Sequence, residues 1–329
     1  MFHSNPAVRP RGLPDGTNLP PASYSYCVSS RSRLFTITAA VIVTALACFV
    51  AALGIICQLT LHVPRIVPTI PSNLLLRYPA ELWQVRSIRA ADGVRLDSWF
   101  VRPPVRNGNC VIVLHGIGDS RRGSAGYAPL FLDEGYSVLL PDSRGHGSSE
   151  GDLVTYGLLE KSDVLSWAHW LRQQDCKALY SLGESLGGSV LIQAAALGPD
   201  FRAIVAESSF ADLTAIAEFR VRQIFHLPPL LESVIPPPLV RNTMTYAKFR
   251  YGIDLRQVLP IESIRHTATP ILLIHGLRDS RTPYWHSQAL ARANVQSLLW
   301  SVPYAEHTGA YSTAPVEFRR RVLGWFDSH

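Results

Sequence analysis

The sequence predicts an α/β protein with a mostly parallel sheet of eight strands, helices on both faces of that sheet, and one membrane-spanning helix in front of it. Three observations support this fold class. Short continuous apolar runs alternate with helical stretches, as expected for strands that are buried on both faces. Two strands with alternating apolar and polar residues precede these runs. Nearer the N-terminus lies an uncharged apolar segment of 24 residues.

The composition is that of a chain with a large buried core. Hydrophobic residues make up 47% of it, charged residues only 17%, and the formal net charge is +6 at pH 7. The basic residues are dispersed along the chain and form no stripe that could follow a phosphate backbone. We therefore expect no nucleic-acid partner.

The apolar segment, residues 34–57, contains no charge and nothing more polar than threonine. As a helix it would span about 36 Å, enough to cross a hydrocarbon core of about 30 Å. The apolar region of a cleaved signal peptide has only about 7–15 residues. A lipoprotein signal ending at Cys48 is disfavoured because the apolar run continues beyond it. We therefore expect an uncleaved transmembrane anchor over residues 34–60.

The arginines on either side of this segment predict its orientation. Four precede it and two follow it more sparsely: Arg9, Arg11, Arg31, Arg33, Arg65 and Arg77. By the positive-inside rule the N-terminus stays in the cytoplasm, and the C-terminal part crosses to the periplasmic or extracytoplasmic side. Residues 1–33, rich in Pro, Ser, Asn and Gly, are expected to form a disordered cytoplasmic tail. The proline-rich residues 61–80 are expected to form a semi-rigid spacer.

One globular domain is expected over residues 81–329. Its first two strands, 83–89 and 94–101, flank the turn Ala91-Asp92-Gly93 and form a hairpin with one face in solvent. The parallel strands that follow are the apolar runs at 110–114, 136–140, 178–182, 203–206 and 271–274. A last strand at 297–302 precedes a helix over residues 314–326.

Residues 210–264 interrupt this alternation of strands and helices. They contain proline clusters and amphipathic helical pieces but no strand pattern. An insertion between the sixth and seventh strands predicts a small helical cap over the carboxyl edge of the sheet. Open α/β sheets bind their ligands at that edge.

The segment Gly183-Glu-Ser-Leu-Gly187 matches the pattern G-x-S-x-G. It follows the strand at 178–182 and leads into a helical run at 188–197, which is the strand–turn–helix context of a nucleophile elbow. Glycines allow the neighbouring backbone to pass close by, while Ser185 adopts strained dihedral angles that expose its hydroxyl. This context favours a nucleophile over a buried serine that caps a helix.

A serine hydroxyl needs a positioned base, which is itself oriented by a carboxylate. In this arrangement the acid and then the histidine follow the serine along the chain. Asp279 lies in the loop after the seventh strand, and His307 lies in the loop after the eighth. If Asp279 only caps its own loop, Asp212 is the replacement acid. His307 is preferred to two other histidines because of their positions: His275 lies within the Asp279 loop, and His286 within the next helix.

The oxyanion of an acyl-transfer reaction needs preorganised N–H donors. We expect one from the backbone of Leu186, directly after the nucleophile, and the other from Ile117 in the loop after the third strand. His115 is expected to tie down that loop. The histidines are dispersed and lack a paired carboxylate spacing, so neither a metal nor another cofactor is expected.

The five cysteines contain no C-x-x-C pair. Cys110 and Cys176 each open a predicted strand, and these strands would be parallel neighbours that begin at the same edge of the sheet. A disulfide between them is an alternative in an oxidising compartment. Two small buried thiols are the favoured interpretation, because free cysteine is among the most buried residue types.

These motifs, in this order, resemble the α/β-hydrolase superfamily: Leu114-His-Gly-Ile-Gly, Asp142-Ser-Arg-Gly-His-Gly-Ser-Ser149, Gly183-Glu-Ser-Leu-Gly187, His275-Gly-Leu-Arg-Asp279 and His307. Over about residues 81–329 the chain looks most similar to membrane-anchored α/β-hydrolase-domain proteins and to prolyl-oligopeptidase-like and serine-aminopeptidase-like hydrolases. The resemblance implies a catalytic triad, two oxyanion donors, and a loop at 142–149 that forms a wall beside the site. The residues concerned are Ser185, Asp279, His307, Ile117 and Leu186.

The favoured function is hydrolysis of carboxylic esters or thioesters of acyl or lipid-like substrates, which a membrane tether beside an apolar cap would suit. A serine peptidase or amidase of prolyl-oligopeptidase or aminopeptidase type is the alternative, weakened by the lack of an N-terminal β-propeller. A catalytically inactive, membrane-tethered binding scaffold is the alternative from another class. Dehalogenase and epoxide hydrolase chemistry is disfavoured because it places a carboxylate where Ser185 stands.

Overall fold

The structure is a computed structural model and describes residue 3 and residues 30–329. The chain divides into two units, Met1–Phe49 and Val50–His329, and helix α1 (Ser30–Leu61) runs through the boundary between them. Within the described part of the chain, Ser32–Leu61 is the one helix long and apolar enough to cross a membrane. The tail predicted at 1–33 lies outside the described residues, apart from residue 3 and residues 30–33, of which the latter are helical.

The second unit is built on the predicted sheet of eight strands, in the order β1-β2-β4-β3-β5-β6-β7-β8. β1 and β2 form an antiparallel hairpin, β2 pairs antiparallel with β4, and every pair from β4 to β8 is parallel. The fold class is therefore confirmed. The strands are β1 (Trp83–Arg89), β2 (Arg95–Val101), β3 (Asn109–Leu114), β4 (Ser137–Pro141), β5 (Ala178–Glu184), β6 (Phe201–Glu207), β7 (Ile271–Gly276) and β8 (Ser297–Val302).

Helices cover both faces of the sheet, and each face has its own core. Side chains alternate along a strand, so Ile112 and Leu114 belong to one core while Val111 and Val113 belong to the other. The first core is covered by α5 (Glu160–Arg172), α6 (Leu186–Ala195), α10 (Pro260–Arg265) and α11 (Trp285–Ala293). The second is covered by α2 (Ser72–Arg77), α4 (Ala128–Leu132) and α13 (Pro315–Asp327). Two short helices complete the domain: α3 (Arg121–Ser124) and α12 (Ala310–Thr313).

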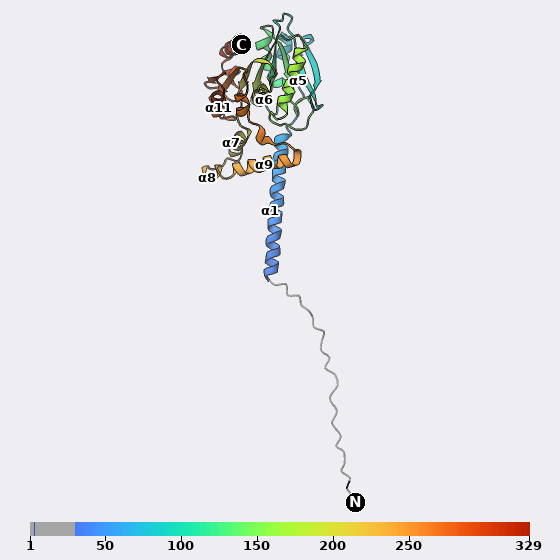
Figure 1. Ribbon diagram of the computed structural model, residues 1–329, viewed down its shortest axis with the longest axis vertical. Coiled ribbons are helices and arrows are strands. Elements are labelled where there is room, and N and C mark those ends of the chain that lie inside the picture. Colours follow the sequence, from blue (N-terminus) through green and yellow to red (C-terminus); the bar gives the residue numbers. More distant parts are fainter. Residues whose placement is uncertain (1–2, 4–29) are drawn as a thin grey trace. The chain divides into compact units, whose positions relative to one another are not determined.

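All the regular elements in the segment predicted as a cap are helices. Between β6 and β7 lie α7 (Leu213–Phe225), α8 (Pro229–Glu232), α9 (Pro236–Tyr251) and a 3₁₀ turn (Leu255–Gln257), followed by α10. Figure 1 shows α7, α8 and α9 grouped together beside the sheet domain. Val240, Met244 and Ala247 recur along one side of α9 and are buried, and Met244 also accepts a hydrogen bond from Thr214 of α7 at 3.6 Å. These contacts join the two long cap helices.

Part of the segment predicted as a spacer packs on the domain instead. Leu74 of α2 and Tyr78 are buried in the second core. Arg65 donates hydrogen bonds to the carbonyl oxygens of Ser149 at 2.7 Å and Gly151 at 2.5 Å. Proline density indicated a linker, but prolines also precede helices without disturbing them, and the leucines of α2 supply an apolar face.

Cys110 and Cys176 form a disulfide, which corrects the expectation of two buried thiols. The reason is the register of the sheet. β3 and β5 are parallel neighbours, with Asn109 opposite Ala178, and this places the two cysteine Cα atoms 5.6 Å apart. That separation lies within the range that a disulfide requires.

Candidate active site

Ser185 stands at a strained turn between β5 and α6. Its φ of 52° and ψ of −116° fall in a region that residues with a side chain rarely adopt. The turn is possible because of two glycines: a Cβ atom at Gly183 would lie 2.5 Å from the backbone of Gly187, and one at Gly187 would lie 2.5 Å from the carbonyl oxygen of Leu114. The N–H of Ser185 donates to the carbonyl oxygen of Glu207 at 2.8 Å. Contacts with β3 and β6, the strands on either side of β5, therefore hold Ser185 in its strained conformation.

Three predicted side chains meet at the carboxyl edge of the sheet. His307 Nε2 lies 2.9 Å from Ser185 Oγ, and His307 Nδ1 lies 2.8 Å from Asp279 Oδ2. The other carboxylate oxygen of Asp279 accepts the N–H groups of Arg281 and Thr282, each at 2.9 Å. Asp279 thus caps its own loop and also contacts the imidazole, so the two interpretations of this residue do not exclude each other.

The environment keeps Asp279 ionised. Burial of this fully covered carboxylate would raise its pKa, but the hydrogen bond from His307 and those from two backbone N–H groups outweigh burial and lower the pKa below its usual value. An ionised acceptor fixes the tautomer of the imidazole, with the proton on Nδ1 and the lone pair on Nε2 directed at Ser185. The His307 side chain is 14% exposed, so it remains open to a ligand.

The alternative acid and histidines have other hydrogen-bond partners, although His275 Nε2 also lies 3.5 Å from Asp279 Oδ2. Asp212 caps α7 by accepting the N–H of Ala215 at 3.0 Å. His275 is buried and bonds to the hydroxyl of Ser287 at 2.7 Å and the carbonyl oxygen of Thr282 at 2.9 Å. His286 accepts the N–H of Ala211 at 3.1 Å.

Leu186 directly follows Ser185, and the loop that carries Ile117 passes close to Ser185 at Gly116. Leu186 begins α6, so its N–H has no acceptor within the helix. Ile117 lies in the loop after β3 with its side chain 42% exposed. This loop approaches the nucleophile closely, because a Cβ atom at Gly116 would lie 3.5 Å from that of Ser185.

Two buried histidines fix the Ile117 loop. His115 Nε2 accepts the N–H of Ser143 at 3.1 Å, and His146 Nε2 accepts the N–H of Gly118 at 3.2 Å. Burial lowers the pKa of His115, and burial together with the neighbouring His115 lowers that of His146 to about 4. Both rings are therefore neutral near pH 7 and can accept these bonds.

The loop at 142–149 is a rigid support. The Asp142 carboxylate accepts the N–H groups of Arg121 at 2.7 Å and Ser148 at 2.8 Å. Arg144 forms buried hydrogen bonds with Asp163, one of them at 2.6 Å, and reaches Asp92 at 2.7 Å. These bonds hold the loop that in turn holds Gly118 and Ser143.

Sequence analysis did not single out a group of buried polar residues beneath the site. Glu207 Oε1 accepts the N–H of Ala310, three residues beyond His307, at 2.8 Å. The hydroxyl of Tyr127 lies between two acids, 3.0 Å from Glu207 and 3.3 Å from Glu184. Since Glu207 also binds the N–H of Ser185 through its carbonyl oxygen, it connects the loop of the base to that of the nucleophile. A glutamate that ends an apolar strand next to the nucleophile's strand is the signal that could have revealed it.

Glu207 and Glu184 lie in an environment that disfavours their charged forms. Burial raises the pKa of Glu207 to about 6. Burial and the charge of Glu207 raise the pKa of Glu184 to about 7. The folded chain therefore binds protons here that an unfolded chain would release at lower pH.

We expect Glu207→Gln to flatten the dependence of stability on pH. The pKa of Glu207 is about 6 in the folded chain against 4.5 ordinarily, so the free energy of unfolding falls as pH rises between these values. Glutamine resembles the protonated acid and can keep the bonds to Ala310 and Tyr127. Between about pH 4 and pH 8, the free energy of unfolding should fall by about 2 kcal/mol more in the unaltered chain than in the variant. Chemical denaturation at each pH measures this difference. Glu306→Gln, an exposed acid near His307, is the control, and an unchanged pH dependence in Glu207→Gln would contradict the prediction.

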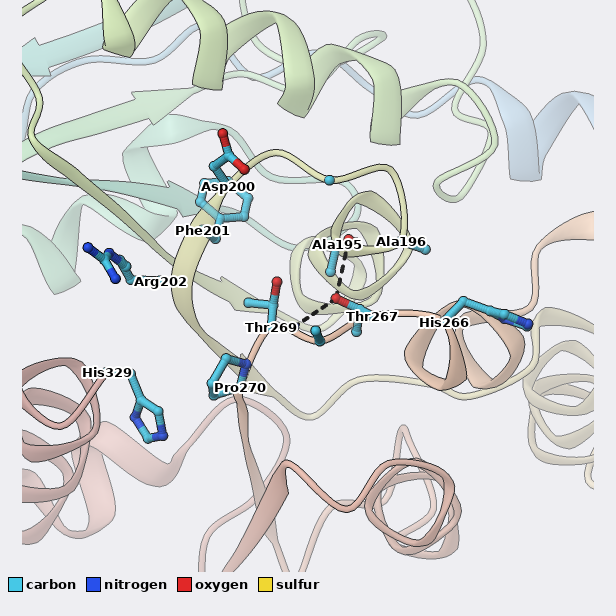
Figure 2. Close-up of a pocket in the computed structure, with 12 residues that line it drawn as sticks. Ala195, Ala196, Asp200, Phe201, Arg202, His266, Thr267, Thr269, Pro270 and His329 are labelled. Carbon is cyan, nitrogen blue, oxygen red and sulfur yellow. Dashed lines mark hydrogen bonds between the residues drawn. The ribbon is translucent and has the colours of Figure 1, made fainter.

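A surface hollow of about 520 Å³ lies at the opposite edge of the sheet, where β6 and β7 begin. Figure 2 shows Thr267 donating to the carbonyl oxygen of Ala195, a bond of 3.2 Å. The charged side chains of its lining are all exposed. This hollow therefore lies away from Ser185 and offers no buried charged group to a ligand.

Comparison with known proteins places the chain in a family. The profile of the prolyl oligopeptidase family matches residues 124–329, more than half of the chain, including Ser185, Asp279 and His307. The chain belongs to the prolyl oligopeptidase family. It is 29% identical to YqkD of Bacillus subtilis, an uncharacterized protein, over 227 residues that make up 67% of this chain and 72% of YqkD. It is 28% identical to a thermostable monoacylglycerol lipase of a Bacillus species over 114 residues, 32% of this chain and 43% of the lipase.

Solved structures agree on the fold. The esterase Pf2001 of Pyrococcus furiosus matches with a TM-score of 0.65 and 23% identity, over 82% of this chain and 98% of the esterase. At that identity the likeness establishes the fold alone, which is the α/β-hydrolase fold. Together with the family, this makes the chain an α/β hydrolase.

Among the described residues, no group of three or more histidines, cysteines or acids could hold a metal ion.

Proposed function

We propose that this chain is a serine hydrolase that cleaves carboxylic ester or thioester bonds of acyl or lipid-like substrates. The observation that carries the proposal is the distance of 2.9 Å between His307 Nε2 and the hydroxyl of Ser185 on its strained turn. The likeness to a monoacylglycerol lipase supports the ester class.

In the proposed reaction, Ser185 Oγ attacks the substrate carbonyl carbon while His307 Nε2 takes the hydroxyl proton. The carbonyl oxygen becomes an oxyanion that the N–H groups of Leu186 and Ile117 stabilise. The bond to the leaving alcohol or thiol then breaks, and His307 returns the proton to that group, which leaves an acyl-enzyme. Water, deprotonated by His307, attacks the acyl carbon and releases the acid and Ser185. Asp279 holds the imidazole in place throughout.

Ser185→Ala should abolish labelling by a fluorophosphonate probe, because the probe forms its bond with an activated serine oxygen. Ser166→Ala, which changes a half-buried serine of α5, is the matched control and should label as the unaltered chain does. The measurement is in-gel fluorescence of the full chain in detergent. If the unaltered chain also fails to label, the inactive binding scaffold becomes the better interpretation.

A peptidase or amidase is the second candidate, favoured by the match to the prolyl oligopeptidase family. A panel of p-nitrophenyl esters of increasing chain length, acyl thioesters and aminoacyl anilides separates the two. We expect turnover of the esters to exceed that of the anilides. Cleavage of the anilides alone would make the chain a peptidase.

We also propose that the predicted segment 34–60 contains an uncleaved membrane anchor, with residues 34–53 in the bilayer, the N-terminus in the cytoplasm and the hydrolase domain on the far side. The arginine distribution supports this orientation. Cys57 and Leu61 at the end of α1 are fully buried in the domain core, which suits a helix that is kept. The disulfide suits an oxidising compartment.

A further inference from the structure

The cap carries an apolar surface that the fold leaves uncovered. We define the cap tip as residues 224–235, which join α7, α8 and the start of α9. Six of its large apolar side chains are between 36% and 87% exposed, and only Leu227 is half-buried. The six are Ile224, Phe225, Leu230, Leu231, Val234 and Ile235. Glu232 is its only acidic residue, and it contains neither lysine nor arginine. Exposed large apolar side chains gathered in one short segment indicate an interaction site.

The cap tip is joined to the active-site edge of the sheet. Gln223, the residue before the tip, donates from Nε2 to the carbonyl oxygen of Ser280 at 2.6 Å. Ser280 directly follows Asp279, whose carboxylate binds His307. The tip therefore begins beside the loop that holds the proposed base.

The other end of the cap rests on the last residues of α1. A Cβ atom at Gly54 would lie 3.1 Å from the hydroxyl of Tyr246, and the hydroxyl of Tyr251 donates to Gln58 at 3.2 Å. The ring of His62 lies 6.0 Å from that of Tyr251. Helix α9 thus begins at the cap tip and ends against residues 54–62, and Figure 1 shows it extending from α8.

This contact sets the depth of the cap relative to a bilayer. Residues 34–53 are twenty uncharged residues, and as a helix they measure about 30 Å, the thickness of a hydrocarbon core. A bilayer that they span has residues 54–62 at its surface. The end of α9, where Tyr246 and Tyr251 contact those residues, lies at the same level.

The charges of α9 fit that position. The helix contains no acid, and Arg241, Lys248 and Arg250 are exposed on it. Basic side chains beside exposed apolar ones are the pattern of helices that lie in the interface of an anionic membrane. Phe249, 86% exposed, adds a further apolar side chain.

We propose that the cap tip and Phe249 insert into the bilayer that α1 spans, in the leaflet next to the hydrolase domain. Lipid-like substrates then pass from this leaflet along the cap to Ser185 without crossing bulk water. The insertion stands on the contacts of the cap alone, whereas the route of the substrate rests on the proposed function.

The insertion is tested with the full chain in vesicles of phosphatidylcholine and phosphatidylglycerol. An environment-sensitive fluorescent amino acid replaces Leu230, Phe249 or, as the control, Val295, which is fully exposed just before β8 at the opposite edge of the sheet. Lipids with a spin label on the acyl chain should quench the fluorophore at positions 230 and 249 but not at 295. No quenching at 230, as when a protein partner covers the tip, or equal quenching at 295, would overturn the insertion.

The substrate route is tested with the double variant Leu230→Asp/Val234→Asp and the control Val295→Asp. Turnover of a long-chain ester in the vesicles, divided by turnover of soluble p-nitrophenyl acetate, should fall about tenfold in the double variant and stay constant in the control. An unchanged ratio would overturn the route. If the unaltered chain hydrolyses neither ester, the proposed function fails and the route with it, while quenching at 230 still decides the insertion.

Discussion

Replacing His307 with alanine should lower kcat for a p-nitrophenyl ester by about 10⁶-fold, and replacing Asp279 with alanine by about 10⁴-fold. The imidazole lies 2.9 Å from the Ser185 hydroxyl and 2.8 Å from Asp279. In the proposed reaction it takes the hydroxyl proton while Asp279 holds it in place. Because the three side chains act as a unit, Ser185→Ala combined with His307→Ala should be no slower than His307→Ala alone. Steady-state kinetics of the full chain in detergent measure each effect.

Asp212→Ala is the matched control for Asp279→Ala. Both acids follow strands of the sheet, but Asp212 caps α7 through the N–H of Ala215. Its loss should cost about 1 kcal/mol of stability and change kcat by no more than about twofold. A larger loss of kcat in Asp212→Ala than in Asp279→Ala would reverse the assignment of the acid.

The order of the strands explains why so much of this fold could be predicted. Apolar runs that are buried on both faces need no long-range information to be recognised, and the helices between them require parallel neighbours. The ends of the strands were less predictable. β5 continues to Glu184 and β6 to Glu207 because the parallel ladder pairs these two acids, which lie beyond the apolar pattern.

Chain order was also enough to bring Ser185, Asp279 and His307 to one edge of the sheet, since parallel strands end together. What it could not predict is how that edge is held in place. Glu207 contacts Ser185 through its carbonyl oxygen and Ala310 through its carboxylate. Contacts between residues that lie far apart in the sequence leave no period or motif in it, so only the tertiary arrangement reveals them.

The boundary between α1 and the domain also depends on tertiary contacts. Its apolar pattern continues to Leu61, and a lipid-facing residue cannot be told from a core residue by hydropathy alone. Cys57 and Leu61 pack in the domain core, and the carbonyl oxygen of Leu61 accepts the N–H of Val154 at 2.8 Å. The domain therefore begins within the predicted anchor rather than after a spacer.

Loss of the disulfide should lower the free energy of unfolding of the domain by about 4 kcal/mol, because the bridge closes a long loop in the unfolded chain. Cys110 and Cys176 are separated by 66 positions. For a domain of this size, that loss should lower Tm by about 10 °C. The double variant Cys110→Ala/Cys176→Ala, followed by thermal denaturation of the full chain in detergent, measures it. Cys48→Ala is the control, since Cys48 is an exposed free thiol in α1.

The redox state of Cys110 and Cys176 also tests on which side of the membrane the domain lies. Disulfides persist in oxidising compartments and are reduced in the cytosol, so chain taken from cells and denatured without reductant should react with a maleimide at three of its five cysteines. With reductant, all five should react. Reaction at all five without reductant would mean that Cys110 and Cys176 are thiols in the cell. In that case the domain lies on the reducing side of the membrane, and the orientation drawn from the arginines is wrong. The sheet register that brings the two cysteines together would stand in either case, because it depends on the pairing of β3 with β5 and not on the bond between the sulfur atoms.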